Sequence, residues 1–473
     1  MKRVWLYPVI VAGFVVAIAG VLNFGTAWLG PVAVVAPLTS PAATPAIEPW
    51  QIWRGNLAAP LARLLLQIVI VIVAARLFGA VARWLGQPSV IGEMAAGIAL
   101  GPSLFGAVSP DLFARLFPPA SFGVLQLLSQ IGVILFMFVV GLDFNWRHVR
   151  QRAHAAVVVS NVSILFPFLL GVLAALALYA DHVPAGISFR AFGLFMGIAM
   201  SITAFPVLAR ILSERDMLTT PVGAMALTCA AVDDVTAWTL LAFVVAVVTS
   251  GGSLATVGVT LALTGVFALL MIAAVRPALA ALLRERPGQD AFSKERVAIV
   301  IAVVFASALT TEVIGVHALF GAFIAGISLP AGESFRAGLR DRLESFSSVL
   351  LLPLFFAFTG LRTQIGLLND ASSWLLCLGI VALATIGKLG GSAMAARLMG
   401  MDWNSSFILG ALMNTRGLME LIALNVGYDL GVISPEMFTI LVVMALVTTA
   451  MTGPLVDAAM RRGGGHRAIM GTR

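Results

Sequence analysis

The chain has 473 residues, 60% of them hydrophobic and only 11% charged, with a formal net charge of +7. Soluble domains carry about a quarter charged residues, so a soluble protein of this length would lack the charges for its surface. Apolar runs of about 18 or more residues recur along the chain. This pattern is typical of membrane-spanning helices and differs from the ~10-residue alternating segments of a β-barrel. We therefore predict an all-α, polytopic membrane protein.

Fourteen apolar segments are expected in chain order. We place them at residues 4–22, 62–82, 89–106, 120–142, 154–180, 191–211, 221–249, 255–275, 297–314, 316–330, 346–363, 374–396, 405–427 and 435–458.

Basic residues are distributed unevenly between the two ends of these segments. If Lys2 and Arg3 lie in the cytoplasm and the segments alternate in direction, 22 of the 29 basic residues fall at cytoplasmic ends and five at outer ends. Lys388 and Arg416 remain inside the membrane. Such a positive-inside bias sets the orientation of a membrane protein, so the basic excess reflects topology and predicts no nucleic-acid partner. We expect a multi-pass protein of the inner cell membrane with both termini in the cytoplasm.

Four parts are expected along the chain. Residues 1–22 form a transmembrane helix or a signal peptide, and we favour a retained helix because about 19 apolar residues are long for a signal peptide and no clean cleavage site follows. Residues 23–60 form a Pro/Ala-rich extracytoplasmic linker, residues 61–459 one membrane domain, and residues 460–473 a short basic cytoplasmic tail. No glycine-rich phosphate loop appears, so any transport would be powered by ion gradients.

Neither an enzyme nor a cofactor is expected. Cys229 and Cys377 lie inside apolar segments and are interpreted as small core residues. No cysteine and histidine cluster predicts a metal site, and no constellation of nucleophile and base supports an intramembrane enzyme.

Two of the predicted helices are interrupted by polar residues at membrane depth. Segment 191–211 contains Ser201–Pro206 (SITAFP), and segment 405–427 contains Asn414–Gly417 (NTRG). A proline kink alone is common in membrane helices. Corresponding interruptions in two halves, however, indicate an inverted repeat with a binding site near the bilayer midplane.

The adjacent carboxylates Asp233 and Asp234 are the principal candidate site. No charged residue lies at 217–232 or at 235–275. If the helix starts near Pro221, Asp233 lies roughly 18 Å deep, near the middle of a ~30 Å hydrocarbon layer. Each intramembrane carboxylate costs about 2.5–3.5 kcal/mol, so two adjacent ones indicate a function. Successive helix positions lie ~100° apart, so the two carboxylates can face different partners. A buried structural pair is the alternative.

Lys388 is the complementary buried charge, flanked by Gly387, Gly390 and Gly391. A lysine at this depth is either neutral or paired with a carboxylate. A Lys388–Asp233 pair is the natural hypothesis, and a lysine that reaches the membrane interface is the alternative.

The remaining ionisable residues in apolar segments are less specific. Arg416 and Glu420 are four residues apart and can pair on one helix face. For Glu93, Arg416 and Glu420 we weigh structural charge pairing equally with a role in an ion pathway. His317 is interpreted as a structural residue at a helix start, and Glu312 as the mark of a helix end.

Five stretches of sequence carry a resemblance to a known family. They are residues 87–103 (QPSVIGE leading to GPS), 136–143 (FMFVVGLD), 201–212 (SITAFPVLARIL), 316–330 (VHALFGAFIAGISLP) and 352–361 (LPLFFAFTGL). Together they resemble the monovalent cation/proton antiporter superfamily, in particular the branch with bacterial Na⁺/H⁺ and K⁺/H⁺ antiporters and plant cation/H⁺ exchangers. The resemblance covers about residues 61–459, and the motifs are specific only in combination.

The resemblance implies a 13-helix antiporter core with inverted repeats and two broken, crossing helices, preceded here by one extra N-terminal helix. It also implies a dimerisation domain beside a mobile core domain, hence a homodimer in the lipid bilayer. By motif position, Asp234 matches the ion-binding aspartate, Asp233 matches the aspartate that pairs with a lysine, and Lys388 matches that lysine. Thr203 falls in the unwound stretch beside the site. Asp234 would bind Na⁺ or K⁺ transiently.

The expected function is secondary active monovalent cation/proton antiport by alternating access, with cation and protons competing at Asp234 and at the Asp233–Lys388 pair. Plant exchangers usually carry Asn-Asp at this position, whereas Asp-Asp resembles electrogenic Na⁺/H⁺ members, so Na⁺ is favoured. A K⁺/H⁺ antiporter for potassium efflux, an organic-anion carrier of similar architecture, and a sensor or channel remain alternatives. Many relatives append a cytoplasmic regulatory domain that is absent from this sequence, so regulation through such a domain is not expected within it.

Overall fold

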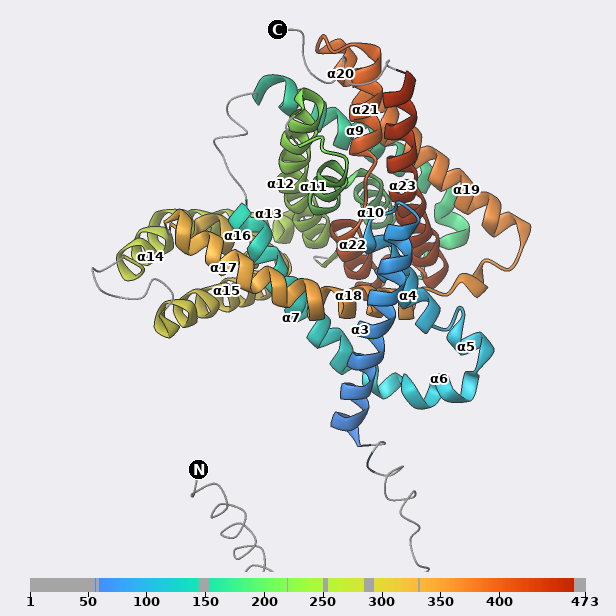
Figure 1. Ribbon diagram of the computed structural model, residues 1–473, viewed down its shortest axis with the longest axis horizontal. Coiled ribbons are helices and arrows are strands. Elements are labelled where there is room, and N and C mark those ends of the chain that lie inside the picture. The colour runs from blue at the N-terminus through green and yellow to red at the C-terminus, as the bar shows by residue number, and fades with distance from the viewer. Residues whose placement is uncertain are drawn as a thin grey trace, which may run out of the picture. The chain divides into compact units, whose positions relative to one another are not determined.

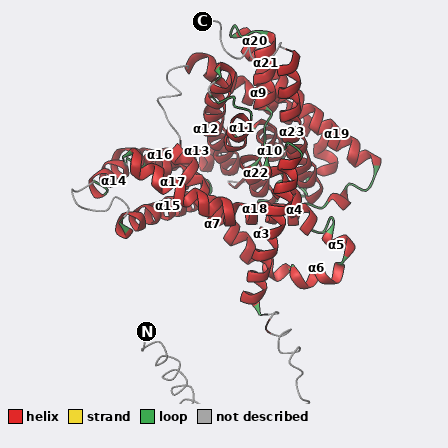
Figure 2. Cartoon of the chain, viewed as in Figure 1, coloured by secondary structure: helices red, strands yellow, loops and turns green. Residues whose placement is uncertain are grey.

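The computed structural model describes residues 56, 59–143, 153–218, 220–249, 254–284, 293–330 and 332–462. Within these ranges every regular element is a helix and no strand occurs (Figure 2). The fold is that of the compact unit that begins at Pro60. The predicted helix or signal peptide at 1–22, almost all of the linker at 23–60, and the tail after residue 462 lie outside the described residues.

The first half of the chain includes two short connecting helices, α5 and α6, and one π-helical turn, η1. The bounds of its helices are α3 Pro60–Trp84, α4 Ser89–Leu100, α5 Phe105–Val108, α6 Pro110–Leu116, α7 Pro119–Asp143, α9 Ala153–His182, α10 Phe189–Ser201, α11 Phe205–Glu214, α12 Pro221–Thr249, α13 Leu254–Leu270, η1 Met271–Val275 and α14 Arg276–Leu282.

The helices of the second half include two further π-helical turns, η2 and η4, and one 3₁₀ turn, η3. Their bounds are α15 Lys294–Ile314, α16 Ala318–Ser328, α17 Glu333–Phe346, η2 Ser347–Leu351, α18 Leu352–Arg362, η3 Ile365–Leu367, α19 Ala371–Thr385, η4 Ile386–Gly390, α20 Gly391–Leu398, α21 Trp403–Met413, α22 Leu418–Asp429 and α23 Pro435–Arg462.

The all-α, polytopic prediction is confirmed by the helix lengths and composition. Among the described residues, 10 helical stretches are long and apolar enough to cross a membrane, or up to 11 if α21 and α22, bent by 43°, form one span. Helices α10 and α16 are shorter and apolar. The number of 13 core helices stays a prediction.

Three predicted segments differ in extent by several residues from the helices that occupy them. Segment 255–275 is too short, because the helix continues through η1 and α14 to Leu282. The helix in segment 89–106 ends earlier than predicted, because α4 ends at Leu100 just before Gly101 and Pro102. The residue before a proline is disfavoured in helical geometry. Segment 346–363 begins too late, because the helix starts at Glu333. Helix α17 contains several charged residues, so a search for apolar runs did not predict it.

The helices pack in two groups. The scaffold group comprises α3, α4, α7 and α15–α18, in which α4 packs on α3 and α18, and α7 packs on α16 and α18. The site group comprises α9–α12 and α19–α23, in which α9 packs on α10, α12 and α20, and α23 packs on α19 and α21. Figure 1 shows α9, α12, α20 and α21 together at the top of the view, and α14, α15 and α17 at the left.

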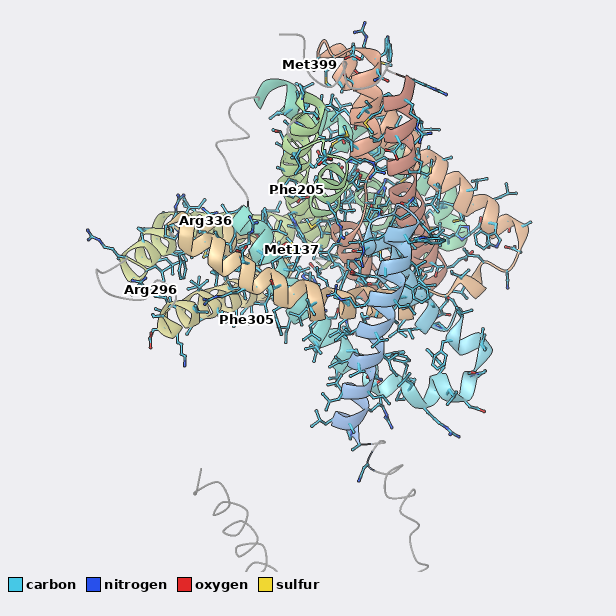
Figure 3. The ribbon with its side chains drawn as sticks, in the orientation of Figure 1. Met137, Phe205, Arg296, Phe305, Arg336 and Met399 are labelled. Carbon is cyan, nitrogen blue, oxygen red and sulfur yellow. The ribbon has the colours of Figure 1, made fainter. Side chains whose placement is uncertain are left out.

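Glycines allow the closest approaches within the scaffold group. A Cβ atom on Gly360 of α18 would lie 2.1 Å from the Gly97 carbonyl carbon of α4. Small residues let membrane helices pack backbone against backbone. At the end of α7, Arg336 of α17 donates a hydrogen bond to the Leu142 carbonyl (Figure 3). These contacts make the scaffold group a closely packed support for the site group.

Both predicted helix interruptions are present, and they meet. The chain is non-helical at 202–204, between α10 and α11, and at 414–417, between α21 and α22. The Ala204 backbone N–H donates to the Thr415 carbonyl at 3.0 Å. Pro206 lies in the first turn of α11, where the missing N–H of proline would have no helical partner anyway. The proline therefore starts the second half-helix and does not kink a continuous one.

Candidate functional site

The site is built around a buried ion pair. Lys388 Nζ lies 3.0 Å from Asp233 Oδ2, and both side chains are 0% exposed. Asp233 lies in the middle of α12, and Lys388 lies in the π-helical turn η4. The structure thus brings together the two residues that the sequence analysis paired. A lone charge at this depth would be strongly disfavoured, because nothing would replace its hydration.

Two serines of α9 complete this pair, and the sequence analysis did not identify them. Ser160 Oγ donates to Asp233 Oδ1. Lys388 Nζ donates to the Ser163 carbonyl at 3.0 Å and to its hydroxyl at 2.9 Å. Their spacing of three residues places both hydroxyls on one face of a helix. That spacing inside an apolar segment was the available signal.

The glycines around Lys388 explain how its helix reaches α9. A Cβ on Gly387 would lie 3.0 Å from Pro167 Cβ, and one on Gly391 would lie 2.9 Å from the Phe166 ring. Both helices therefore approach closely at the level of Ser163. The π-helical turn Ile386–Gly390 inserts one extra residue into the helix, a feature that occurs frequently at functional sites. The glycines and the turn together direct Lys388 to its partners.

Thr203 connects the ion pair to the crossing of the broken helices. Its hydroxyl lies 2.8 Å from Asp233 Oδ2 and 3.1 Å from the Met413 carbonyl. Thr203 belongs to the non-helical stretch 202–204, and Met413 ends α21. One hydroxyl of the first interruption thus contacts α12 and the last residue of α21, directly before the second interruption.

Asp234 faces a different environment from its neighbour. It is 3% exposed, and its Oδ1 is a buried atom for which the described residues offer no hydrogen-bond partner. The backbone of Phe205, the first residue of α11, hydrogen-bonds the Asp234 carboxylate (Phe205 is labelled in Figure 3). The start of a helix carries partial positive charge, which stabilises a carboxylate there. The Asp234 carboxylate therefore accepts a backbone hydrogen bond, while its Oδ1 accepts none from the described residues.

Arg416 and Glu420 form a second buried ion pair beside the first. Arg416 Nη1 lies 2.6 Å from Glu420 Oε2, and both side chains are 0% exposed. Arg416 also donates to the carbonyls of Ala199 at 2.9 Å and Met200 at 2.8 Å. These carbonyls belong to the last turn of α10, and Glu420 belongs to the first turn of α22. A cation at a helix end and an anion at a helix start both oppose the helix dipoles. We call this arrangement the arginine clamp.

Threonines of α23 hold the second interruption in place. The Thr449 hydroxyl accepts from the Arg416 backbone N–H and donates to the Arg416 carbonyl, both at 2.9 Å. The Thr452 and Thr415 hydroxyls are 3.4 Å apart. The Thr449 hydroxyl thus satisfies two backbone groups of Arg416 that a broken helix leaves without helical partners. The sequence analysis did not single out Thr449 or Thr452.

The other predicted candidates lie away from the ion pairs. Glu93 lies on α4, where the Ser89 hydroxyl bonds its carboxylate and accepts from Arg210 of α11 at 2.7 Å. A pathway role and structural pairing both stay open for Glu93. His317 is the N-cap of α16 with a positive φ of 92°. Glu312 lies in the last turn of α15 and accepts from the Ala318 backbone N–H at 2.7 Å. Both positions agree with their structural interpretation.

Chemically, a buried carboxylate oxygen without a hydrogen-bond partner is a group that can accept a proton or act as one ligand of a small cation. Asp234 offers a buried carboxylate oxygen without a hydrogen-bond partner among the described residues, and the adjacent Asp233 accepts from the Thr203 hydroxyl of the first interruption. Within the ranges that the structure describes, no group of three or more His, Cys, Asp or Glu residues could hold a metal ion. A monovalent cation, which binds oxygen ligands weakly and reversibly, fits this single carboxylate better than a tightly held divalent metal.

The chain is similar to known proteins over most of its length. The chain matches the family described as "Sodium/hydrogen exchanger, transmembrane" over residues 69–462. It is 45% identical over 394 residues to the Na(+)/H(+) antiporter NhaS4 of Synechocystis sp., an alignment that covers 83% of this chain and 96% of that protein.

Plant and yeast relatives are also similar over most of the chain. It is 40% identical to Cation/H(+) antiporter 17 of Arabidopsis thaliana and 31% identical to K(+)/H(+) antiporter 1 of Saccharomyces cerevisiae, each over 85% of this chain. The alignments cover 48% and 47% of those proteins. The chain therefore spans about half the length of these plant and yeast relatives.

One solved structure shares the fold. It is the sodium proton antiporter MjNhaP1 from Methanocaldococcus jannaschii, with a TM-score of 0.59 and 15% sequence identity, covering 84% of this chain and 97% of that one. At this identity the likeness concerns the fold alone.

Proposed function

We propose that this chain, which belongs to the sodium/hydrogen exchanger family, is a secondary active Na⁺/H⁺ antiporter that works by alternating access. Cation and protons compete at Asp234 and at the Asp233–Lys388 pair. The observation that carries the proposal is one buried Asp234 oxygen without a partner among the described residues, beside a lysine–aspartate pair of 3.0 Å, where two broken helices cross.

Competition for one carboxylate is sufficient to couple the two ion fluxes. A carboxylate inside the membrane is more stable when a proton or a cation neutralises it than when it is bare. Asp234 would bind either a proton or a partly dehydrated cation, with carbonyls of the interrupted helices as further ligands. Because the two ions exclude each other, each passage of a cation in one direction returns protons in the other.

The Asp233–Lys388 pair adds a second proton to this scheme. A bound cation repels the Lys388 ammonium and attracts Asp233, so cation binding would weaken the pair and release the lysine proton. Exchange would then move two protons per Na⁺, and net charge would cross the membrane. Each charge carries about 2.3 kcal/mol per 100 mV. If Lys388 keeps its proton throughout, exchange is electroneutral.

The identity of the cation rests on two observations. The Asp-Asp sequence and the 45% identity to a relative named as a Na(+)/H(+) antiporter favour Na⁺. The 31% identity to a yeast relative named as a K(+)/H(+) antiporter supports K⁺/H⁺ exchange as the second candidate. An organic-anion carrier is less favoured, because the free polar atom at Asp234 is a carboxylate oxygen, which would repel an anion.

The setting of the transporter follows from topology and resemblance. We place it in the inner cell membrane with both termini in the cytoplasm, because 22 of the 29 basic residues then lie at cytoplasmic helix ends. A homodimer is proposed from the dimerisation domain that the resemblance implies. Its test is the mass of the purified protein with bound lipid and detergent subtracted.

The test of the function is proton flux in proteoliposomes that hold a pH gradient. Addition of Na⁺ or K⁺ should move protons in wild type, and the more effective ion identifies the substrate. Asp234→Asn should abolish the response. Asp341→Asn is the matched control, because Asp341 has a 73% exposed side chain on α17, and it should respond like wild type.

Two results would contradict the proposal. One is a folded wild type that responds to neither cation. The other is an Asp234→Asn variant that responds as strongly as the Asp341→Asn control.

A further inference from the structure

A second polar network lies at the opposite end of α22 from the ion pairs. Asp429, the last residue of α22, accepts from Arg362 of α18 at 2.7 Å through Oδ1 and from Gln126 of α7 at 3.1 Å through Oδ2. Arg362 also donates to Asn425 Oδ1 at 3.1 Å, and Asn425 donates to the Thr359 hydroxyl at 2.9 Å. Each of these bonds joins the site group to the scaffold group.

The arginine in this network is held from several sides. Its guanidinium carbon lies 4.2 Å from the centre of the Phe358 ring of its own helix and 5.2 Å from the centre of the Tyr428 ring of α22. Arginine stacks on aromatic faces while its N–H groups bond carboxylates. Arg362 thus contacts three side chains at the end of α22: the Tyr428 ring, the Asp429 carboxylate and the Asn425 amide.

The network borders a cavity between the two groups of helices. Its lining includes Gln126 and Ser129 of α7, His317 before α16, and Asn425 and Asp429 of α22. The topology expected from the basic residues places this end of α22 on the extracytoplasmic side. The cavity and the network therefore lie where an outer entrance between the two groups would open.

Helix α22 connects this network mechanically to the ion-binding region. It begins at Leu418, directly after the interruption that carries Arg416, and ends at Asp429. Its 12 residues span roughly 18 Å at ~1.5 Å per residue. A short helix behaves as a rigid rod, so a shift of the site group against the scaffold group must displace Asp429 from Gln126 and Arg362.

We propose that Asp429, Arg362 and Gln126 form a latch that closes the outer entrance, and that transport requires this latch to open in each cycle. The energetics suit a reversible contact. The side chains of Arg362 and Asp429 are 16% and 34% exposed, and ion pairs with access to water contribute little net stability. The side chains of the Lys388–Asp233 and Arg416–Glu420 pairs, in contrast, are 0% exposed and have no access to water in this structure.

The latch rests on the proposed antiport function, and its test separates the two. The background is a chain in which Cys229 and Cys377 are replaced by alanine. Gln126→Cys and Asp429→Cys are introduced together, and a short bifunctional methanethiosulfonate links the two thiols. Reduction removes this bridge. The bridge should reduce cation-evoked proton flux at least tenfold, and reduction should restore it. The matched control is Ser373→Cys with Glu436→Cys, which replaces a 2.9 Å contact inside the site group. Its bridge should leave the flux unchanged.

The outcomes are distinct for the two proposals. Antiport is contradicted if wild type and both unbridged double-cysteine proteins all show no cation-evoked proton flux. Equal flux with and without the bridge between positions 126 and 429, or failure of that bridge to form in a folded protein, overturns the latch.

A second measurement does not depend on transport. Ser129 is buried at 1% exposure in the cavity wall, so Ser129→Cys in the same background should react slowly with a membrane-impermeant thiol reagent. Addition of Asp429→Asn, which removes the charge and keeps the shape, should raise that reaction rate at least fivefold. A rate that stays the same or falls would show that Asp429 does not keep this entrance closed.

Discussion

The two buried ion pairs among the described residues are alike in burial and different in their surroundings. Lys388–Asp233 and Arg416–Glu420 both have 0% exposed side chains, with nitrogen–oxygen distances of 3.0 and 2.6 Å. The lysine pair contacts three serine and threonine hydroxyls and one backbone carbonyl, that of Ser163. The arginine, in contrast, binds two backbone carbonyls at the end of α10.

This difference indicates different tasks. A hydroxyl can donate or accept a hydrogen bond, so it can remain bonded to a lysine or an aspartate in either protonation state. A carbonyl only accepts, and Arg416 donates to two of them at the end of one broken helix, whereas most partners of the lysine pair are hydroxyls. Arginine keeps its charge in proteins, whereas a buried lysine can lose its proton. The lysine pair is therefore suited to proton exchange, and the arginine clamp is suited to hold the broken helices together.

Removal of the clamp should have the largest effect on stability. Arg416→Ala leaves Glu420 as a buried charge and leaves the carbonyls of Ala199 and Met200 without donors. Breaking a buried pair in this way costs about 3–5 kcal/mol, measured as the loss of unfolding free energy in detergent. Arg461→Ala is the control, because Arg461 is exposed in the last turn of α23, and it should change stability by about 0.5 kcal/mol or less. Equal losses in the two variants would show that the clamp is not structural.

Substitution of lysine by arginine in one pair, and of arginine by lysine in the other, should separate the effect of positive charge from the effect of proton release. Lys388→Arg keeps a positive charge beside Asp233 but cannot release a proton. In that variant we expect cation-evoked flux that no longer responds to membrane voltage, a loss of about 2.3 kcal/mol of driving force per 100 mV. The mirror variant Arg416→Lys should lose stability and keep the voltage response. Flux driven by voltage alone in Lys388→Arg vesicles would assign the second proton to another group.

The charged members of the site were predictable because charge is rare in this sequence. Asp233, Asp234 and Lys388 stand out in long apolar segments, and burial makes any such residue expensive. The two helix interruptions were predictable for the same reason, since hydroxyl, amide and glycine residues interrupt apolar runs at 201–206 and 414–417. What these signals share is a local contrast with the surrounding sequence.

The neutral partners were not predictable in the same way. Ser160, Ser163 and Thr449 are ordinary in membrane helices, where hydroxyls often bond the backbone of their own helix. Their roles depend on which face of α9 or α23 packs toward the site, and that is decided by tertiary packing. Asp429 and Arg362 were likewise hidden, because both lie at helix ends, where charged residues are common. Helix α17 was missed because it is helical without being apolar.

The smallest expected effect tests the hydroxyl environment of the lysine pair itself. Ser163→Ala removes the hydroxyl that Lys388 bonds at 2.9 Å, while Lys388 keeps the Ser163 carbonyl and Asp233 keeps Ser160 and Thr203. The same hydroxyl donates to Asp233 Oδ2 at 3.4 Å. One short and one long bond to charged groups are therefore lost while the rest remain, and we expect a loss of about 2 kcal/mol of unfolding free energy.

The matched control is Ser392→Ala on α20. Ser392 is equally buried, and its hydroxyl has no hydrogen-bond partner among the residues that the structure describes. Removal of an unsatisfied buried hydroxyl should be neutral or stabilising, since no bond is lost and a desolvated polar group disappears. If both serine variants lose the same stability, hydroxyls around the lysine pair act only by filling space. The contrast between an exchangeable lysine pair and a permanent arginine clamp would then have to rest on the cations alone.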